Sequence, residues 1–434
     1  MKGDFSRITF DPMKHFKGVR MQQGRVQLDA DWNENLDILL HRIETETMDV
    51  IGLCGFPVHA AGFGVVADPT LLPAEEQQAL KDAGIIPLDA GDFLLTWGRG
   101  YVDGILCEIE NTIPCTQQPF VLPAPEEGPV DDGIYLVYLD VWERLITALE
   151  DPSIREVALG GPDTATRSQV VWQAKFAQVG GVGDNLECDS ELKDWPLAAS
   201  DGLLCARTHP EPEPDDPCTI PPGAGYKRLE NQLYRVEIHR GSDDPDGPTF
   251  KWSRDNGSVL VKIAEFSVDG SADKIRVTSL GRDDVLGLHE QDWVEVLDDA
   301  HELAGEPGFL VQIDKIDRER LLVTLKDDVT GFDLDLHAKL RRWDSEGELP
   351  VEVPAGNDGY IPLEDGVEVK FEINNFRTGD YWTIAARTVP GQYGDIEWPK
   401  DGSDPACLLA FGITHHYCKL AIVTVDGEKI TEVF

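Results

Sequence analysis

Residues 288–325, "LHEQDWVEVLDDAHELAGEPGFLVQIDKIDRERLLVTL", show the strand-and-turn pattern that decides the fold. Apolar and polar residues alternate in three short runs, which are separated by an acidic turn, a loop containing Gly and Pro, and a charged turn. Alternation of this kind between turn residues is typical of half-buried strands. Short twisted strands joined by such turns suit a closed barrel. We therefore predict a small SH3-like barrel here.

The same pattern of short strands and turns extends over most of the chain from Asp92 onward. Short apolar runs bounded by Gly, Pro or Asp recur in "FLLTWGRGYVDGILCEIEN" (93–111), "GIYLVYLDVWERLITAL" (133–149) and "QLYRVEIHR" (232–240). Strand after strand without alternating helices predicts an all-β arrangement and not β-α-β units. The fold class is therefore predicted as mainly β, with several small sandwich or barrel modules, an N-terminal arm and a single long helix.

Composition divides the chain into five segments. The middle segment contains "PEPEPDDPC" (210–218) and is rich in Pro, Gly and acidic residues, which bury little surface. The predicted organisation is an arm and helix over 1–57, a β domain over 58–180, a linker or excursion over 181–230, a β domain with the barrel over 231–345, and a C-terminal β domain over 346–434.

One long helix is predicted over residues 31–51. Apolar residues recur there close to the 3.6-residue period, and glycines follow in "IGLCG". A shorter helix is predicted in "LPAEEQQALKDAG" (72–84). We find no heptad array, so no coiled coil is predicted. The apolar stripe needs a cover, either the chain's own sheets or a neighbouring subunit, which makes it the predicted assembly site: Trp32, Leu36, Leu39, Leu40 and Ile43.

Acidic residues cluster at the start of this helix, and two interpretations compete. Asp29, Asp31 and Asn33 have the spacing of a calcium loop, but the Gly and Glu that such a loop requires are replaced by Glu34 and Leu40. A capping box, with Asp31 as N-cap and Glu34 reaching back to it, explains the cluster better. The acidic residues are therefore predicted to start a helix and not to bind calcium.

Eight cysteines are too few for a disulfide-rich chain of 434 residues. Five of them, Cys54, Cys107, Cys115, Cys407 and Cys418, lie in or beside apolar segments and are interpreted as small buried hydrophobes. The other three cysteines lie in a loop-like region together with a histidine, and the candidate metal set is Cys188, Cys205, His209 and Cys218. These four residues could form a tetrahedral zinc site, and a disulfide or free thiols are the alternatives.

The net charge of −42 limits the partners of the protein. Such a field repels phosphate backbones and anionic lipids, so neither nucleic-acid binding nor membrane insertion is expected. No secretory signal or long apolar run is found, which predicts synthesis in the cytoplasm. No nucleophile elbow, zinc-protease, phosphate-loop or dinucleotide motif stands in its required context, so we expect neither an enzyme nor a cofactor.

Several long stretches together resemble an uncharacterised domain family, DUF6519, found among phage-tail-like and contractile injection system proteins. They include "GDFSRITFDPMKHFKGVRMQQGRVQLDADWNE" (3–34), "YLDVWERLITALEDPSIREVALGGPDTATRSQVVWQ" (138–173), "GDYWTIAARTV" (379–389) and "HHYCKLAIV" (415–423). The resemblance implies a structural component of a tail-like particle, at the baseplate, in a fibre or at an accessory position. It also implies other particle subunits as partners, a homo-oligomer with threefold symmetry favoured, and a particle that is released or acts outside the cell.

Two alternatives remain open at this point. A module that binds cell-surface glycans or a receptor would expose tryptophans for stacking on sugars. A carbohydrate hydrolase would place two carboxylates across a cleft, one with a raised pKa. The tryptophans considered for stacking are Trp97, Trp142, Trp252, Trp293, Trp343, Trp382 and Trp398.

Overall fold

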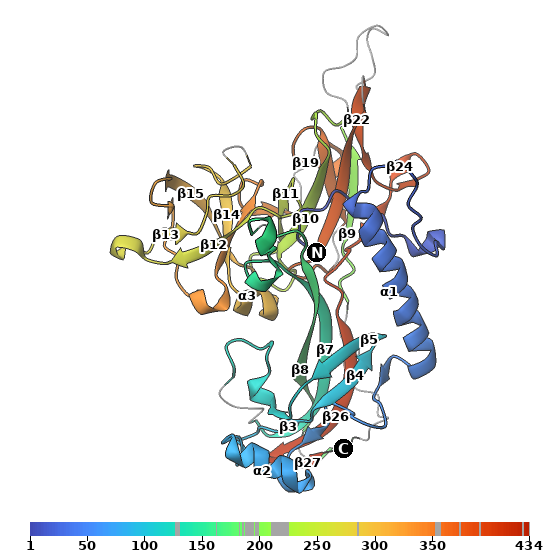
Figure 1. Cartoon of the computed structure of the whole chain (residues 1–434), viewed down its shortest axis with the longest axis vertical. Coiled ribbons are helices and arrows are strands. Elements are labelled where there is room, and N and C mark those ends of the chain that lie inside the picture. Colours follow the sequence, from blue (N-terminus) through green and yellow to red (C-terminus); the bar gives the residue numbers. More distant parts are fainter. Residues whose placement is uncertain are drawn as a thin grey trace.

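The structure is a computed structural model of the chain (Figure 1). It is mainly β, as predicted. The described residues are 1–125, 131–161, 163–181, 183–184, 186, 195, 199–209, 225–283, 286–351, 357–372, 375–389, 392–427 and 429–433.

A closed barrel lies at one side of the molecule, coloured yellow to orange in Figure 1. Its strands follow each other in the order β12-β13-β16-β15-β14-β17, and its interior is filled by aliphatic side chains such as Val294 and Ile313. The small barrel predicted from residues 288–325 is therefore confirmed. Its strands are β12 (Leu260–Glu265), β13 (Lys274–Val277), β14 (Trp293–Leu297), β15 (Phe309–Asp317), β16 (Leu322–Leu325) and β17 (Lys339–Trp343).

A β-sandwich forms the upper part of Figure 1. Two sheets share one apolar core that contains Trp382 from one sheet and Phe371 from the other. The first sheet is β18 (Leu349–Pro350), β11 (Thr249–Ser253), β10 (Gln232–Arg240), β21 (Tyr381–Val389) and β22 (Gln392–Glu397). The second is β19 (Ile361–Pro362), β20 (Val367–Glu372), β9 (Leu203–Thr208) and β25 (Cys407–Leu409), and a hairpin of β23 (Lys400–Asp401) and β24 (Asp404–Pro405) lies beside it.

The lower module is built on two long strands, β7 and β8, which also reach up to the sandwich (Figure 1). Their sheet packs on smaller sheets through a core that contains Phe63, Val137 and Trp172. The main sheet is β27 (Lys429–Val433), β26 (His416–Asp426), β7 (Gly133–Ile146) and β8 (Arg167–Gly180). The smaller sheets are β1 (Cys54–Gly55), β4 (Gly98–Val102) and β5 (Ile105–Ile109), and β2 (Val65–Val66), β3 (Leu94–Leu95) and β6 (Ile113–Pro114).

The modules are interleaved along the chain, unlike the five consecutive segments of the sequence analysis. β26 pairs with β7, so the last predicted domain completes the sheet of the second. Residues 203–208 fall inside the segment predicted as a linker or excursion over 181–230. They form β9, which lies between β20 and β25 with Leu204 and Ala206 in the sandwich core. Long-range pairing outweighs the polar composition around this strand.

Three α-helices are present among the described residues, and one of them is long. The predicted long helix is α1 (Asp29–Ile51), and the predicted short one is α2 (Ala74–Asp82). α3 (Asp299–Ala304) fills the connection between β14 and β15. In the described part of the chain, no helix has the length and apolar content that crossing a membrane requires.

Candidate functional site

Helix α1 starts without the predicted capping box. Its N-cap position is Leu28, and no side chain caps it, so the assignment of Asp31 as N-cap is wrong. Asp29 and Asp31 lie inside the first turn, where carboxylates meet the positive end of the helix dipole. Glu34 does not reach back to the cap, because its Oε2 accepts a hydrogen bond of 2.6 Å from Thr9 Oγ1. The acidic start of the helix is a contact surface for the N-terminal arm.

The arm, residues 1–28, is held along α1 by polar contacts. The backbone N–H of Ser6 donates to Asp29 Oδ2 at 2.8 Å, and that of Val19 donates to Asn35 Oδ1 at 3.1 Å. In addition, the Phe10 ring lies 5.6 Å from the His41 ring. The face of α1 that meets its own chain is therefore largely polar.

The apolar residues of α1 point the other way. Only Ala30 and Ile38 are buried in this helix of 23 residues. The five predicted assembly residues are all exposed, with exposed fractions of 80% for Trp32, 50% for Leu36, 46% for Leu39, 38% for Leu40 and 58% for Ile43. Figure 1 shows α1 on the outer side of the body, so the described part of the chain leaves this stripe uncovered.

The first residues of the arm lie deep in the molecule. Asn256, which is fully buried, donates from Nδ2 to the carbonyl oxygens of Met1 at 3.1 Å and Gly3 at 2.9 Å. The Met1 amine donates to the hydroxyl of Tyr381 at 2.5 Å, and burial lowers the pKa of this amine to about 4. A deletion of residues 1–51 would remove these buried contacts together with α1, so its effect on assembly could not be separated from its effect on folding. Point substitutions on α1 avoid this.

A cavity of about 580 Å³ lies where the arm, α1, β7, the barrel and the sandwich meet. Charged groups from each of these parts line it: Lys2, Glu44, Glu143, Glu237, Glu295 and Arg341. Leu40 also lines the cavity, so it faces the body more than the other four assembly residues do. The cavity is the junction at which the separate modules meet.

Two buried carboxylates in this junction are paired with cations. Glu237 accepts from Lys2 at 2.9 Å and from Arg235 at 2.6 Å, and Glu295 pairs with Lys251. Burial alone would raise the pKa of Glu295, but the charges of Lys251 and Lys2 lower it to about 2. The pKa of Glu237 is likewise lowered, against its burial, by Lys2 and Arg235. These carboxylates stay ionised at neutral pH and cannot serve as the general acid of a hydrolase.

Two carboxyl groups on α1 behave in the opposite way. Burial raises the pKa of Asp37, and the charge of Glu143 raises it further. The pKa of Glu44 is raised by the same two causes. Asp37, Glu44 and Glu143 all line the cavity. A carbohydrate hydrolase would need a carboxyl group with a raised pKa, and Asp37 and Glu44 are the groups in this cavity that have one.

A second cluster of acids surrounds a lysine and not a metal ion. Oxygens of Glu150, Asp299 and Glu302 lie within 4.8 Å of one another, close enough to share a cation. The Nζ atom of Lys339 lies 2.8 Å from Glu150, 3.5 Å from Asp299 and 2.6 Å from Glu302. The Lys339 ammonium group therefore supplies the positive charge among these acids. Through its ion pair with Glu150 it links the barrel to the turn that follows β7.

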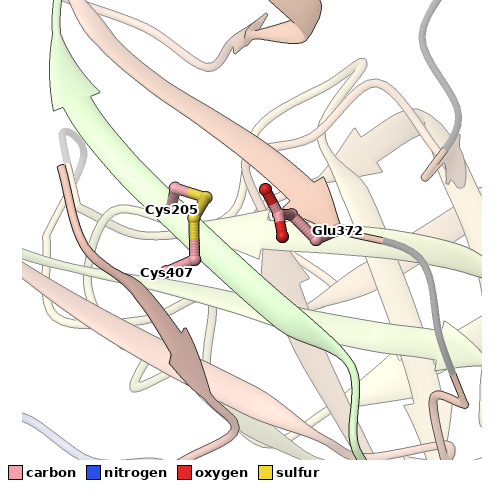
Figure 2. A group of neighbouring side chains, drawn as sticks. All are labelled: Cys205, Glu372 and Cys407. Carbon is pink, nitrogen blue, oxygen red and sulfur yellow. A yellow bond between two sulfur atoms is a disulfide. The ribbon is translucent and has the colours of Figure 1, made fainter. Parts of the chain in front are cut away.

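Of the candidate zinc set, the structure describes Cys205 and His209. Cys205 forms a disulfide with Cys407, which leaves it no thiolate for a metal (Figure 2). Glu372 lies beside this pair, but a disulfide does not ligate zinc as two thiolates do. His209 Nδ1 contacts Glu368 at 2.7 Å instead. Cys188 and Cys218, the other two candidates, lie outside the described residues.

The interpretation of the apolar cysteines as free thiols is wrong for three of the five. Cys407 is bonded to Cys205, as described above. Cys54 and Cys418 form a second disulfide, which joins the segment after α1 to β26. Cys107 and Cys115 are free and buried, as expected. Burial raises the pKa of the Cys107 thiol to about 12, so it acts as a small hydrophobe.

The tryptophans considered for glycan stacking lie mostly inside the molecule. Trp97 is 50% exposed, and Trp293 is half-buried. The other five are buried, which weakens the glycan alternative: Trp142, Trp252, Trp343, Trp382 and Trp398. By contrast, Trp32, the single tryptophan of α1, is 80% exposed and belongs to the assembly stripe.

Comparison with known proteins supports a family assignment and no function. No curated protein and no solved structure matches the chain. One family model, described as a family of unknown function (DUF6519), matches residues 1–194 and 197–431, which is nearly the whole chain. The chain therefore belongs to the DUF6519 family.

Proposed function

We propose that the protein is a non-enzymatic structural component of a phage-tail-like contractile injection particle. It docks through its N-terminal arm and α1 and presents its β modules at the baseplate, in a fibre or at another accessory position. One observation carries the proposal: the apolar stripe of α1 faces away from its own chain. The choice of particle comes from the resemblance of the long sequence stretches.

The energetics of α1 favour a partner. A Leu, Ile or Val side chain gains roughly 1.5–3 kcal/mol on complete burial. The stripe leaves Leu36, Leu39 and Ile43 about half exposed, and Trp32 more so. A monomeric protein forgoes this gain, whereas docking onto a neighbouring subunit recovers part of it. Exposed apolar groups collected on one element are typical of a protein interface.

The two disulfides found among the described residues support an extracellular role for the particle. Disulfides persist in oxidising surroundings and are rare in the cytosol. Cys54–Cys418 and Cys205–Cys407 join parts of the chain that are 364 and 202 residues apart. We propose that the chain is made and assembled in the cytoplasm and that the particle acts outside the cell.

Co-sedimentation with particles tests this function. A C-terminally tagged chain, produced in its natural host, is expected to sediment with tail-like particles and to be located on them by immunogold electron microscopy. A variant with Gln at positions 32, 36, 39 and 43 keeps good helix formers on α1 and is expected to remain in the supernatant. The control carries Gln in place of Leu71 and Val157, two apolar residues that are 78% and 84% exposed elsewhere on the surface.

The outcomes separate docking from general surface effects. Loss of sedimentation in the α1 variant alone supports docking through this helix. Equal sedimentation of all three proteins would refute it, and absence of the unaltered chain from every particle fraction would refute the particle itself. Circular dichroism of the purified variants confirms that they are folded.

A further inference from the structure

We infer that α1 pairs with the α1 helix of a second copy of this chain, in a short parallel coiled coil. The inference deepens the proposed function, because it takes α1 as the assembly element and names its partner. It rests on the spacing of the exposed residues, on the opposite character of the inner face, and on the distribution of charge.

The exposed residues of α1 follow the heptad spacing of a coiled coil. Counting from Trp32, steps of four and three residues reach Leu36, Leu39, Ile43, Glu46 and Val50 in turn. All six are exposed, and Val50 is 79% exposed at the far end. Leu36, Ile43 and Val50 take the a positions, and the other three take the d positions. The pattern is hard to recognise in the sequence because it spans fewer than three full heptads and Glu46 interrupts it.

The face of α1 opposite to this seam meets the body. Ala30 and Ile38 are buried there, and Glu34, Thr45 and Met48 are half-buried. The seam residues are exposed along the whole helix, and the arm reaches the edge of the seam at Asn35, whose Oδ1 accepts from the Val19 N–H at 3.1 Å. A second helix would therefore pack on the seam beside this arm contact.

The charge distribution fits a second copy of the same acidic chain. From Trp32 to Ile43 the residues that flank the seam are Asn33, Asn35, Leu40 and Arg42, with no acid among them. The chain as a whole has 80 Asp and Glu residues among 434. The acids of this part of α1 (Glu34 and Asp37) lie on the half-buried side of the helix. Between Trp32 and Ile43 two copies of the chain, each of net charge −42, therefore place no acid opposite an acid, and the one such contact in the seam is Glu46 against its counterpart.

The seam composition favours two helices over the threefold symmetry expected from the resemblance. β-Branched residues at a with Leu at d favour two-stranded parallel coiled coils. Ile43 and Val50 occupy two of the three a positions, with Leu36 at the third, and Leu39 occupies a d position between Trp32 and Glu46. Glu46 lies opposite its counterpart in a parallel pair, and this like-charge contact weakens the dimer.

The molar mass of the purified full chain tests the inference directly. Light scattering across a concentration series is expected to give twice the monomer mass for the unaltered chain. Leu39→Glu and Ile43→Glu are expected to give monomers, whereas Leu71→Glu, an exposed control away from the seam, leaves the mass doubled. Glu46→Leu is expected to tighten the dimer at least tenfold, because it removes the polar interruption.

Cross-linking tests the parallel register. Leu36 faces its counterpart across a parallel seam, so Leu36→Cys is expected to form an interchain disulfide under mild oxidation. Leu71→Cys and the unaltered chain, oxidised in the same way, are expected to stay unlinked. A Leu36→Cys chain that is a dimer but forms no interchain link, or forms no more of it than Leu71→Cys does, would refute the parallel register.

Several results would overturn the inference. A monomer at every concentration, or a dimer that Leu39→Glu leaves intact, would refute the pairing of α1 with α1. A threefold mass would refute the two-stranded arrangement. A monomer that still sediments with particles through α1 would leave the proposed function standing, whereas a dimer that never sediments would remove that function and keep the pairing.

Discussion

The barrel and helix α1 use apolar residues in opposite directions. In the barrel, the apolar side of each strand faces a closed interior, and Val294, Ile313 and Leu340 have exposed fractions of 0%. In α1, the polar side faces the body and the apolar side faces solvent. A regular apolar pattern in the sequence therefore does not distinguish a surface that is buried within its own chain from one that the chain leaves exposed.

A matched pair of tryptophans gives the largest expected difference between the two regions. Trp343 of β17 is 1% exposed and donates from Nε1 to Glu295 at 2.8 Å, whereas Trp32 of α1 is 80% exposed. Trp343→Ala is expected to lower the free energy of unfolding by about 3–5 kcal/mol. Trp32→Ala is expected to change it by less than about 0.5 kcal/mol.

Chemical denaturation measures both changes, with Leu39→Glu as the background so that unfolding is not coupled to association. A loss for Trp32→Ala as large as that for Trp343→Ala would mean that the monomer itself covers the stripe. The comparison between barrel and helix would then fail.

The disulfide at the end of α1 gives the next largest effect. Replacing Cys54 and Cys418 by Ser is expected to cost about 2–4 kcal/mol, because the bond limits the unfolded chain. The bond also ties the weakly covered N-terminal region to β26, so amide exchange in α1 is expected to speed up. Hydrogen exchange followed by mass spectrometry measures this.

The other disulfide is the control for that experiment. Replacing Cys205 and Cys407 by Ser removes a bond between β9 and β25 within the sandwich. It is expected to lower overall stability without faster exchange in α1. If both pairs affect α1 equally, the tether explanation is wrong.

The smallest expected effect concerns the contact of α1 with the body. Burial raises the pKa of Asp37 in the folded protein, so its ionised form is disfavoured there. This penalty acts at neutral pH and disappears as the pH falls through the folded pKa of Asp37. Asp37→Asn is therefore expected to stabilise the protein at neutral pH, by on the order of 0.5 kcal/mol.

Thermal unfolding at neutral pH and again below the usual pKa of an aspartate tests that sign. The gain from Asp37→Asn is expected to vanish at the lower pH. Asp49→Asn, at an exposed position of the same helix, is the matched control and is expected to show no gain. A gain that persists in acid would contradict the electrostatic explanation.

Local patterns predicted the local elements well. Alternation in residues 288–325 predicted the barrel, and the period of residues 31–51 predicted α1, because both signals repeat within a few residues. The strand β9 escaped detection, because its six residues lie inside a segment rich in Pro and acidic residues. The pairing of β7 with β26 could not be foreseen either, since no local pattern encodes contacts between strands so far apart.

The candidate site was predicted in part. The five stripe residues were identified from periodicity, but their direction depends on how the arm covers the polar face of α1. The pairing of Cys205 with Cys407 depends on β9 and β25 lying side by side, which only the fold decides. The anchoring of Met1 and Gly3 left no trace in the local sequence, because their partners are distant: Asn256 lies in the turn after β11, and Tyr381 begins β21.

The anchoring of Met1 has a consequence for the order of events during synthesis. The hydrogen bond between Met1 and Tyr381 joins residues 380 positions apart. At roughly 5–20 residues per second, a ribosome needs roughly 20–75 s to make the chain between them. The contact of Met1 with Tyr381 therefore forms only after this interval, although the arm can already bind α1 through Ser6 and Val19.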